Sequence, residues 1–468
     1  MSRTVISGGT VVGATGAIAA DVLVDGERIV ALASPGSEIA DSFSAGATRR
    51  IDASGRLVVP GGLDVHTHME MPFGGTYASD TFETGTRAAA WGGTTTIIDF
   101  AIQRRGEALR QGFDALLAKA EGNCAVDYGF HMIVSDVNDQ SLKEMDMLIG
   151  EGVTSFKLFM AYPGVFYSTD GEILRAMQQA AGNGATIMMH AENGIAIDLI
   201  VAEALARGET DPRFHARTRP SALEGEATHR AIALAGVAGA PLYIVHLTAA
   251  EALGAVVDAR DTGRNVFAET CPQYLFLSDA ELDRPGFEGA KYVCSPPLRP
   301  HWHQAELWRG LKTNDLSVVS TDHCPFCFKE QKELGRGDFS KIPNGLPGVE
   351  HRVELIYQGV VRGDISVERW VELIATTPAR MFGLYPKKGV IAPGADADIV
   401  IYDPGIRQTI SASTHHMNVD YSVYEGLEIT GKVETVLSRG EVIVDNGRFG
   451  GAKGHGRFLE RGTNQYLI

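Results

Sequence analysis

The chain has 468 residues, of which 44% are hydrophobic and 21% charged, as in an ordinary globular protein. Asp and Glu outnumber Lys and Arg by 58 to 42, and the net charge of −16 argues against nucleic acid or an anionic membrane as partner. No segment reaches the roughly 20 apolar residues of a membrane span, and the N-terminus lacks a signal-peptide pattern. With only five cysteines, a cytoplasmic protein without a disulfide framework is expected.

Both ends of the chain carry the same pattern of short strands and glycine turns. Residues 1–58 contain TVISGG, DVLVDGERIVAL and RRIDASGRLV, and residues 391–450 contain ADADIVIYDP and GKVETVLSRGEVIVDNGRF. Short apolar runs separated by Asp-Gly and other glycine turns are typical of antiparallel strands. The two ends are therefore predicted to form one small β-sandwich domain.

Residues 59–390 alternate strands with helices. Apolar strand patterns such as GGTTTIIDFA, TSFKLFMA and ATIMMHAEN are each followed by an amphipathic helical pattern. This repetition predicts an α/β fold, a (β/α)8 barrel of the TIM type, in which the chemistry lies at the carboxyl ends of the strands. Residues 451–468 form a C-terminal tail, which is expected at a subunit interface only by analogy with known proteins.

Polar residues stand at the ends of the predicted barrel strands. His66 and His68 are two apart in DVHTH, so on a strand both side chains face the same side. Any one strand-end histidine is most simply a half-buried side chain, but several histidines with a carboxylate suit divalent zinc or a related metal. The predicted metal ligands are His66, His68, Lys157, His190, His246 and Asp322.

Lys157 is the unusual member of this set, because it lies inside the apolar run SFKLFMAY. An unpaired ammonium in such a place is costly, which leaves a snorkelling side chain, a salt bridge or a chemical change. Two cations held by His66 with His68 and by His190 with His246 repel each other and need anionic bridges. A neutral lysine amine that reacts with carbon dioxide gives a carbamate with two oxygens. Lys157 is therefore a candidate for N6-carboxylysine, and from the residues alone a buried salt bridge stays open as the alternative.

Nine stretches of the sequence resemble one family. They are GGLDVHTHMEMPFGG, GGTTTIIDFA, SFKLFMAY, MMHAEN, YIVHLT, ETCPQYL, STDHCPF, PNGLPGVE and HHMNVDY. Through them, and essentially end to end, the chain resembles the cyclic amidohydrolases of the amidohydrolase superfamily, specifically the D-hydantoinase/dihydropyrimidinase group. The resemblance implies hydrolysis of dihydropyrimidines and 5-substituted hydantoins to N-carbamoyl amino acids. It also implies a homotetramer with two divalent ions per subunit, preferably Zn²⁺.

The resemblance also implies roles for individual residues. The six strand-end residues would hold the two ions, with Lys157 as the bridging carbamate. Tyr162, Ser295 and Asn344 would bind the substrate, the last two mainly through backbone groups. Asp322 would move a proton from the attacking water to the leaving nitrogen, and Tyr162 would stabilise the oxyanion. From the residues alone, an ordinary loop tyrosine and a turn asparagine stay open as alternatives.

Three other functions are consistent with parts of this pattern. An allantoinase-like cyclic ureide hydrolase is the nearest, although its usual sequence after the H-x-H pair differs from MPFGG. Dihydroorotase relatives carry an arginine where this chain has Glu70. A non-catalytic homologue, like the collapsin response mediator proteins, would lack the ligands that are complete here. Substrate choice is expected to lie in the loops at 69–76, 101–105 and 159–167, with Met71, Phe73, Phe159 and Tyr162 as candidate walls.

Overall fold

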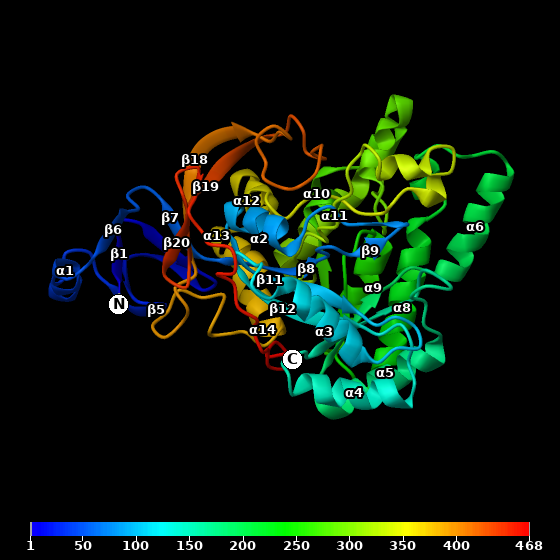
Figure 1. The fold of residues 1–468 in the computed structure, drawn as a ribbon, viewed down its shortest axis with the longest axis horizontal. Helices are drawn as coiled ribbons and strands as arrows, with labels where there is room; N and C mark the ends of the chain where they lie inside the picture. Colours follow the sequence, from blue (N-terminus) through cyan, green and yellow to red (C-terminus); the bar gives the residue numbers. More distant parts are fainter. Residues whose placement is uncertain (1, 468) are drawn as a thin grey trace.

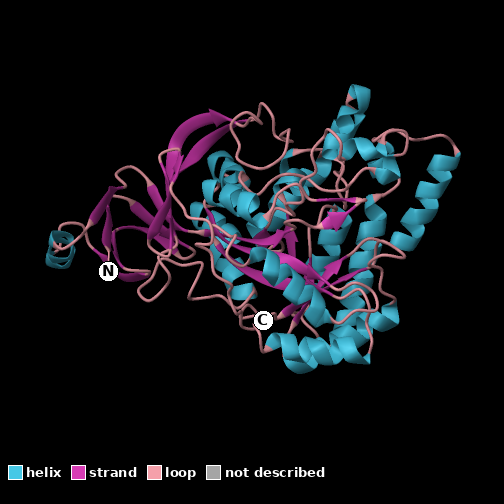
Figure 2. Ribbon diagram, in the orientation of Figure 1, coloured by secondary structure: helices cyan, strands magenta, loops and turns pink. Residues whose placement is uncertain are grey.

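The computed structural model describes residues 2–467. Strands from the two ends of the chain, blue and orange to red in Figure 1, lie together on one side of the molecule. The middle of the chain forms a larger body beside them, in which Figure 2 shows strands surrounded by helices. The predicted α/β barrel with a smaller β domain from both termini is confirmed.

The barrel is a sheet of eight strands in chain order, and every neighbouring pair is parallel. Its strands are β8 (Gly62–Thr67), β11 (Thr94–Ile102), β12 (Asp127–Ile133), β13 (Ser155–Phe159), β14 (Thr186–His190), β15 (Leu242–Ile244), β16 (Val266–Thr270) and β17 (Val318–Val319). Strand β17 is short, and the barrel closes just beyond it. There Thr67 pairs with His323, and the N–H of His68 donates to the His323 carbonyl at 2.9 Å.

Helices cover the outside of the barrel. The longer ones are α2 (Phe82–Trp91), α3 (Leu109–Ala120), α4 (Asp139–Ile149), α5 (Asp170–Asn183), α6 (Gly194–Ala206), α8 (Ser221–Ala238), α9 (Ala250–Asp261), α11 (Trp302–Thr313) and α12 (Arg352–Arg362). Helix α5 shows why such segments are helical. Thr169 and Glu172 form a capping box, and Ile173, Ala176 and Met177 form one buried face. Within residues 2–467, no helix is both long and apolar enough to cross a membrane.

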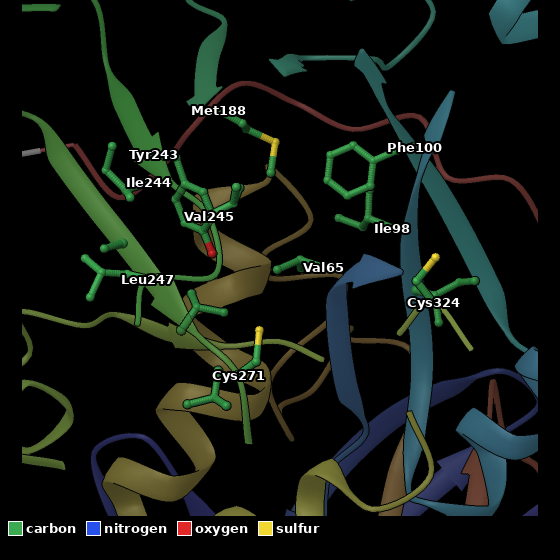
Figure 3. Close-up of a cluster of buried hydrophobic side chains, with 14 of the residues drawn as sticks. Val65, Ile98, Phe100, Met188, Tyr243, Ile244, Val245, Leu247, Cys271 and Cys324 are labelled. Carbon is green, nitrogen blue, oxygen red and sulfur yellow. The ribbon is translucent and has the colours of Figure 1, made fainter. Parts of the chain in front are cut away.

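Apolar side chains fill the barrel interior. Figure 3 shows Val65, Ile98, Phe100 and Met188 together with Tyr243 in this cluster, and each of them is at most 2% exposed. The barrel is therefore a packed core rather than a pore.

Two sheets make up the smaller domain. One contains β1 (Arg3–Ser7), β4 (Asp21–Asp25), β5 (Arg28–Ala33) and β6 (Arg49–Asp52). The other contains β2 (Thr10–Gly13), β3 (Gly16–Ala19), β7 (Leu57–Pro60), β18 (Ile399–Thr409), β19 (Glu428–Ser438), β20 (Glu441–Asp445) and β21 (Arg448–Phe449). Val22 and Ile29 from the first sheet share a buried cluster with Ile399 and Leu437 from the second. Strand β7 pairs with β18 as far as Pro60, which is slightly beyond the predicted boundary at 58.

The C-terminal tail packs against the amino-terminal end of the same chain's barrel. The N–H of Tyr128 donates to the Arg457 carbonyl at 3.0 Å, and the N–H of Leu459 donates to the Tyr128 carbonyl at 2.7 Å. Arg461 is buried there and donates to Ser155 at 3.0 Å. The tail thus covers the end of the barrel opposite the predicted site, and its contact with a neighbouring subunit stays a prediction.

Candidate metal centre

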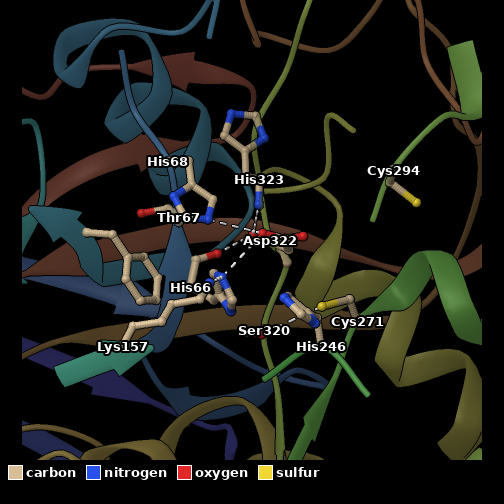
Figure 4. A network of polar contacts seen from close by, with 12 residues as sticks. His66, Thr67, His68, Lys157, His246, Cys271, Cys294, Ser320, Asp322 and His323 are labelled. Carbon is tan, nitrogen blue, oxygen red and sulfur yellow. Dashed lines mark hydrogen bonds and ion pairs between the residues drawn. The ribbon is translucent and has the colours of Figure 1, made fainter. Parts of the chain in front are cut away.

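The barrel brings all six predicted ligands to one end. His66 lies in β8, Lys157 lies in β13 and His190 is the last residue of β14. His246 and Asp322 follow directly after β15 and β17, in the turns that leave the barrel. Figure 4 shows side chains from these separate strands pointing toward one another around Asp322.

The first half of the centre consists of His66, His68 and Asp322. The Nε2 atoms of both histidines lie 3.2 Å from Oδ1 of Asp322. One ligand atom from each of the three residues falls within 4.8 Å of the other two, and all three side chains are buried. This spacing allows the three side chains to share one ion.

The second half consists of His190 and His246, with Lys157 beside them. The two imidazole rings are 4.6 Å apart, and the His246 ring is 5.3 Å from the ring of His66. Nζ of Lys157 lies 3.1 Å from Nε2 of His66. Burial lowers the pKa of the Lys157 amine to about 8. An amine that loses its proton this easily can react with carbon dioxide.

The protonation states of the buried ligands suit a cation. Burial lowers the pKa of His66, His68 and His246, so their imidazoles are neutral and keep a lone pair for a metal. Burial alone would raise the pKa of Asp322, but the hydrogen bond from His68 and the nearby Lys157 amine help to hold that pKa at about 2. Nδ1 of His68 and Nδ1 of His246 are buried without a hydrogen-bond partner among the described residues. The donor set therefore fits divalent ions.

Three of the predicted site residues adopt a strained backbone conformation. The φ angles of Tyr162, His246 and Asp322 are 59°, 40° and 53°, in the left-handed region that non-glycine residues rarely adopt. Such strain persists where the surrounding structure imposes it, and it is concentrated at functional sites. The sequence pattern does not predict these angles, because side-chain periodicity carries no information about a single turn residue.

A cavity of about 50 Å³ opens onto the centre. It is lined by His68, Met71, Phe73, Lys157, Phe159, Tyr162, Phe166, His190, His246, Ser295, Asp322, Cys324, Asn344 and Gly345. The four predicted walls are therefore in place, whereas His66 is fully buried. An outer cavity of about 930 Å³ shares Phe73, Tyr162, Phe166 and Asn344 with the first. The inner space lies directly against the candidate ligands, and the outer one is large enough for a substituent that extends away from them.

Tyr162, Ser295 and Asn344 meet on one wall of the inner cavity. Nδ2 of Asn344 donates to Oγ of Ser295 at 3.1 Å, and the Tyr162 side chain lines the same cavity as both of them. Burial raises the pKa of the Tyr162 phenol above its ordinary value. The hydroxyl thus keeps its proton and is available as a hydrogen-bond donor.

Two buried glutamates that have no predicted role hold the histidines in place. Nδ1–H of His66 donates to Glu269, which also accepts from the Tyr243 hydroxyl at 2.7 Å. Nε2–H of His190 donates to Glu192 at 2.8 Å. Each glutamate fixes one ring nitrogen and leaves the other for a metal. A signal was present in the sequence, since both acids stand at strand ends within ETCPQYL and MMHAEN.

Comparisons with known proteins agree with this geometry. The model of the Amidohydrolase family matches residues 57–443. A D-hydantoinase of Streptomyces coelicolor is 70% identical to this chain, and the match covers 100% of this chain and 99% of that protein. A D-hydantoinase of Geobacillus stearothermophilus is 49% identical, and the match covers 97% of this chain and 96% of that protein. The crystal structure of a dihydropyrimidinase from Brevibacillus agri superposes with a TM-score of 0.96 at 49% identity, covering 98% and 99% of the two chains. The chain belongs to the amidohydrolase family.

Proposed function

We propose that the protein is a metal-dependent cyclic amidase that opens dihydropyrimidine and 5-substituted hydantoin rings to N-carbamoyl amino acids. The observation that carries this proposal is that His68, His190, His246, Asp322 and Lys157 line one small cavity together with Tyr162, Ser295 and Asn344, and that His66 lies buried beside them. The whole-chain similarity to D-hydantoinases and to a dihydropyrimidinase supports the same ring chemistry.

The residues divide naturally between two ions. His66, His68 and Asp322 would hold one ion, His190 and His246 the other, and Lys157 as a carbamate would bridge them. When bound, the ions would lower the pKa of a water nucleophile and polarise the carbonyl that is attacked. Imidazole and carboxylate ligands favour Zn²⁺.

The chain's own side chains would complete the reaction. Asp322 is ionised at neutral pH, so its carboxylate can take a proton from the attacking water and pass it to the ring nitrogen that leaves. The Tyr162 hydroxyl would donate to the carbonyl oxygen as negative charge develops on it. Ser295 and Asn344 would hold the opposite edge of the ring through backbone groups. The apolar side chains Phe73 and Phe159 would exclude water around it.

The assembly and the cellular location are further proposals. We propose a cytoplasmic homotetramer in which the β domain comprises residues 1–58 and 391–450, the barrel residues 59–390 and the tail residues 451–468. Full-length similarity to enzymes of the same group supports this organisation. Native mass spectrometry of the whole chain measures the number of subunits directly.

Ring-opening assays on the purified protein test the proposed activity. The metal content of the purified protein is measured first. The same preparation should then hydrolyse dihydrouracil and a 5-substituted hydantoin faster than allantoin or dihydroorotate. Chelation should remove the activity, and added Zn²⁺ should restore it. Faster turnover of allantoin would favour the ureide-hydrolase alternative, and a metal-free protein without any turnover would favour the non-catalytic one.

Dihydroorotase remains disfavoured for a structural reason. That substrate carries a carboxylate, which calls for a cation in the site. Two residues after the H-x-H pair, this chain has Glu70 instead of an arginine. Oε2 of Glu70 lies 3.5 Å from Nζ of Lys119 and forms an ion pair with it. Dihydroorotate should therefore be a poor substrate.

Glu269→Gln is expected to weaken the binding of the ion held by His66 about 10- to 100-fold, as is typical when a partner of a ligating histidine is lost. The amide is a weaker acceptor for Nδ1–H of His66 and no longer fixes that tautomer. Metal per subunit, measured by mass spectrometry after dialysis against graded chelator, should fall from two ions toward one.

The matched control is Glu354→Gln. Glu354 is a buried carboxylate on α12 that accepts from the N–H of Val433 at 3.0 Å, beside the β domain. This variant should keep both ions. Equal metal retention in the two variants would contradict the role given to Glu269.

A further inference from the structure

Lys332 is a buried lysine that the proposed reaction does not use. It lies in the short helix η3 (Lys332–Gly335) and is fully buried. Its Nζ donates to the carbonyl oxygens of Val293, Pro343 and Gly345 at 2.9, 2.6 and 2.8 Å. All three acceptors are neutral, so the ammonium lacks the anionic partner that usually offsets the cost of burial. The only hydrogen bonds of the buried Lys332 amine among the described residues are therefore those to the three backbone carbonyls, and its role depends on what these carbonyls hold in place.

The three carbonyls belong to the two segments that line the inner cavity. Val293 is two residues before Ser295, and Pro343 and Gly345 flank Asn344. The segments also contact each other, since the N–H of Gly345 donates to the Val293 carbonyl at 3.1 Å. Lys332 is thus a cross-link between the two stretches of backbone from which the substrate ring would be recognised.

The cross-link also sets the direction of individual peptide groups. In a trans peptide the C=O and the following N–H point in opposite directions. By drawing the Pro343 carbonyl toward its buried amine, Lys332 aims the N–H of Asn344 the other way. Gly345 packs closely against Cys324, because a Cβ added at this position would lie 2.2 Å from the Cys324 carbonyl oxygen, so a residue with a side chain would not fit here.

We propose that Lys332 is a positioning residue for substrate, which holds segments 293–295 and 343–345 at the spacing and orientation that the ring edge requires. This inference rests on the proposed function, because it takes Ser295 and Asn344 as the recognition groups. It does not depend on the ions themselves, since the three hydrogen-bond partners of the Lys332 amine belong to the recognition segments and none of them is a candidate metal ligand.

Lys332→Met tests the inference, because it removes the ammonium and keeps a side chain of similar length. For dihydrouracil and a 5-substituted hydantoin, kcat/KM is expected to fall about 100-fold, mainly through KM, which is the effect of a misplaced binding group. Metal per subunit should stay as in the unaltered protein. Binding of hydantoin measured by calorimetry should weaken in parallel. Lys332→Gln keeps two hydrogen-bond donors, so its kcat/KM should lie between those of the unaltered protein and of Lys332→Met. If Lys332→Met does not fold, Lys332→Gln is the variant that tests the inference.

The control is Lys388→Gln, at another buried lysine that has several partners and lies far from the candidate ligands in the sequence. Nζ of Lys388 contacts Asp127 and Asp398, each at 2.6 Å, between the barrel and the β domain. This change should lower the melting temperature but leave KM unaltered in the folded protein. An unchanged KM in both Lys332 variants, a loss of activity that follows loss of metal, or an equal rise of KM in the control would overturn the inference. If the unaltered protein holds two ions but neither binds nor opens these rings, the proposed function fails instead.

Discussion

Asp322→Asn is expected to lower kcat by about 100- to 10,000-fold while the protein keeps its fold, because this is the range that a general base contributes. Asparagine has nearly the same shape, so the contacts with His66 and His68 can be kept in part. It cannot accept a proton from water or pass one to the leaving nitrogen. The measurement is kcat for dihydrouracil, with circular dichroism and the melting temperature as the check on folding.

His68→Asn is the control that separates the base from the ligand. His68 belongs to the same half of the centre and has no proposed role in proton transfer. Its activity loss should be partly reversed by raising the concentration of Zn²⁺, whereas that of Asp322→Asn should persist at saturating metal. Recovery of Asp322→Asn to near-normal turnover would rule out the role of Asp322 as the base.

The fold follows from patterns that are local in the sequence. The barrel strands are short apolar runs bounded by polar residues, and α5 has its cap and its buried face within one segment. The closure of the barrel is different. Strand β17 spans only Val318–Val319, and the last contact is a bridge between Thr67 and His323. The periodicity of the sequence cannot predict the pairing of Thr67 with His323, because these residues are far apart along the chain.

The candidate ligands could be predicted because a parallel barrel gathers its strand ends on one face. Their supporting contacts could not. Glu269 meets His66 across the barrel, and a strand pattern says which side a residue faces but not which side chain it touches. Lys332 misleads more strongly, since KEQKELGRGDF has the composition of a solvated surface while the Lys332 side chain is fully buried. The burial of Lys332 depends on the tertiary structure, in which the loops around Val293 and around Pro343 and Gly345 bring three backbone carbonyls together.

Lys157→Ala is expected to lose most of the bound metal and at least about 1,000-fold in kcat, as when a metal-supplied nucleophile is lost. In the structure, Nζ of Lys157 lies beside Nε2 of His66, and the side chain is 2% exposed. Without the bridging carbamate, two cations would repel each other across the centre with little anionic charge between them. Metal analysis and kcat of the same preparation test both losses.

Short carboxylic acids should restore part of that activity, which distinguishes a missing anionic bridge from a damaged fold. The alanine leaves room for formate or acetate, whose two oxygens could take the place of the carbamate. Lys157→Arg is the matched control, because its guanidinium keeps the positive charge, fills the space and stays protonated, so it cannot form the carbamate. It should be poor in metal and unresponsive to the acids. Full activity in Lys157→Arg, or a mass spectrum of the active, metal-loaded native protein without the added carbon dioxide, would contradict the carbamate.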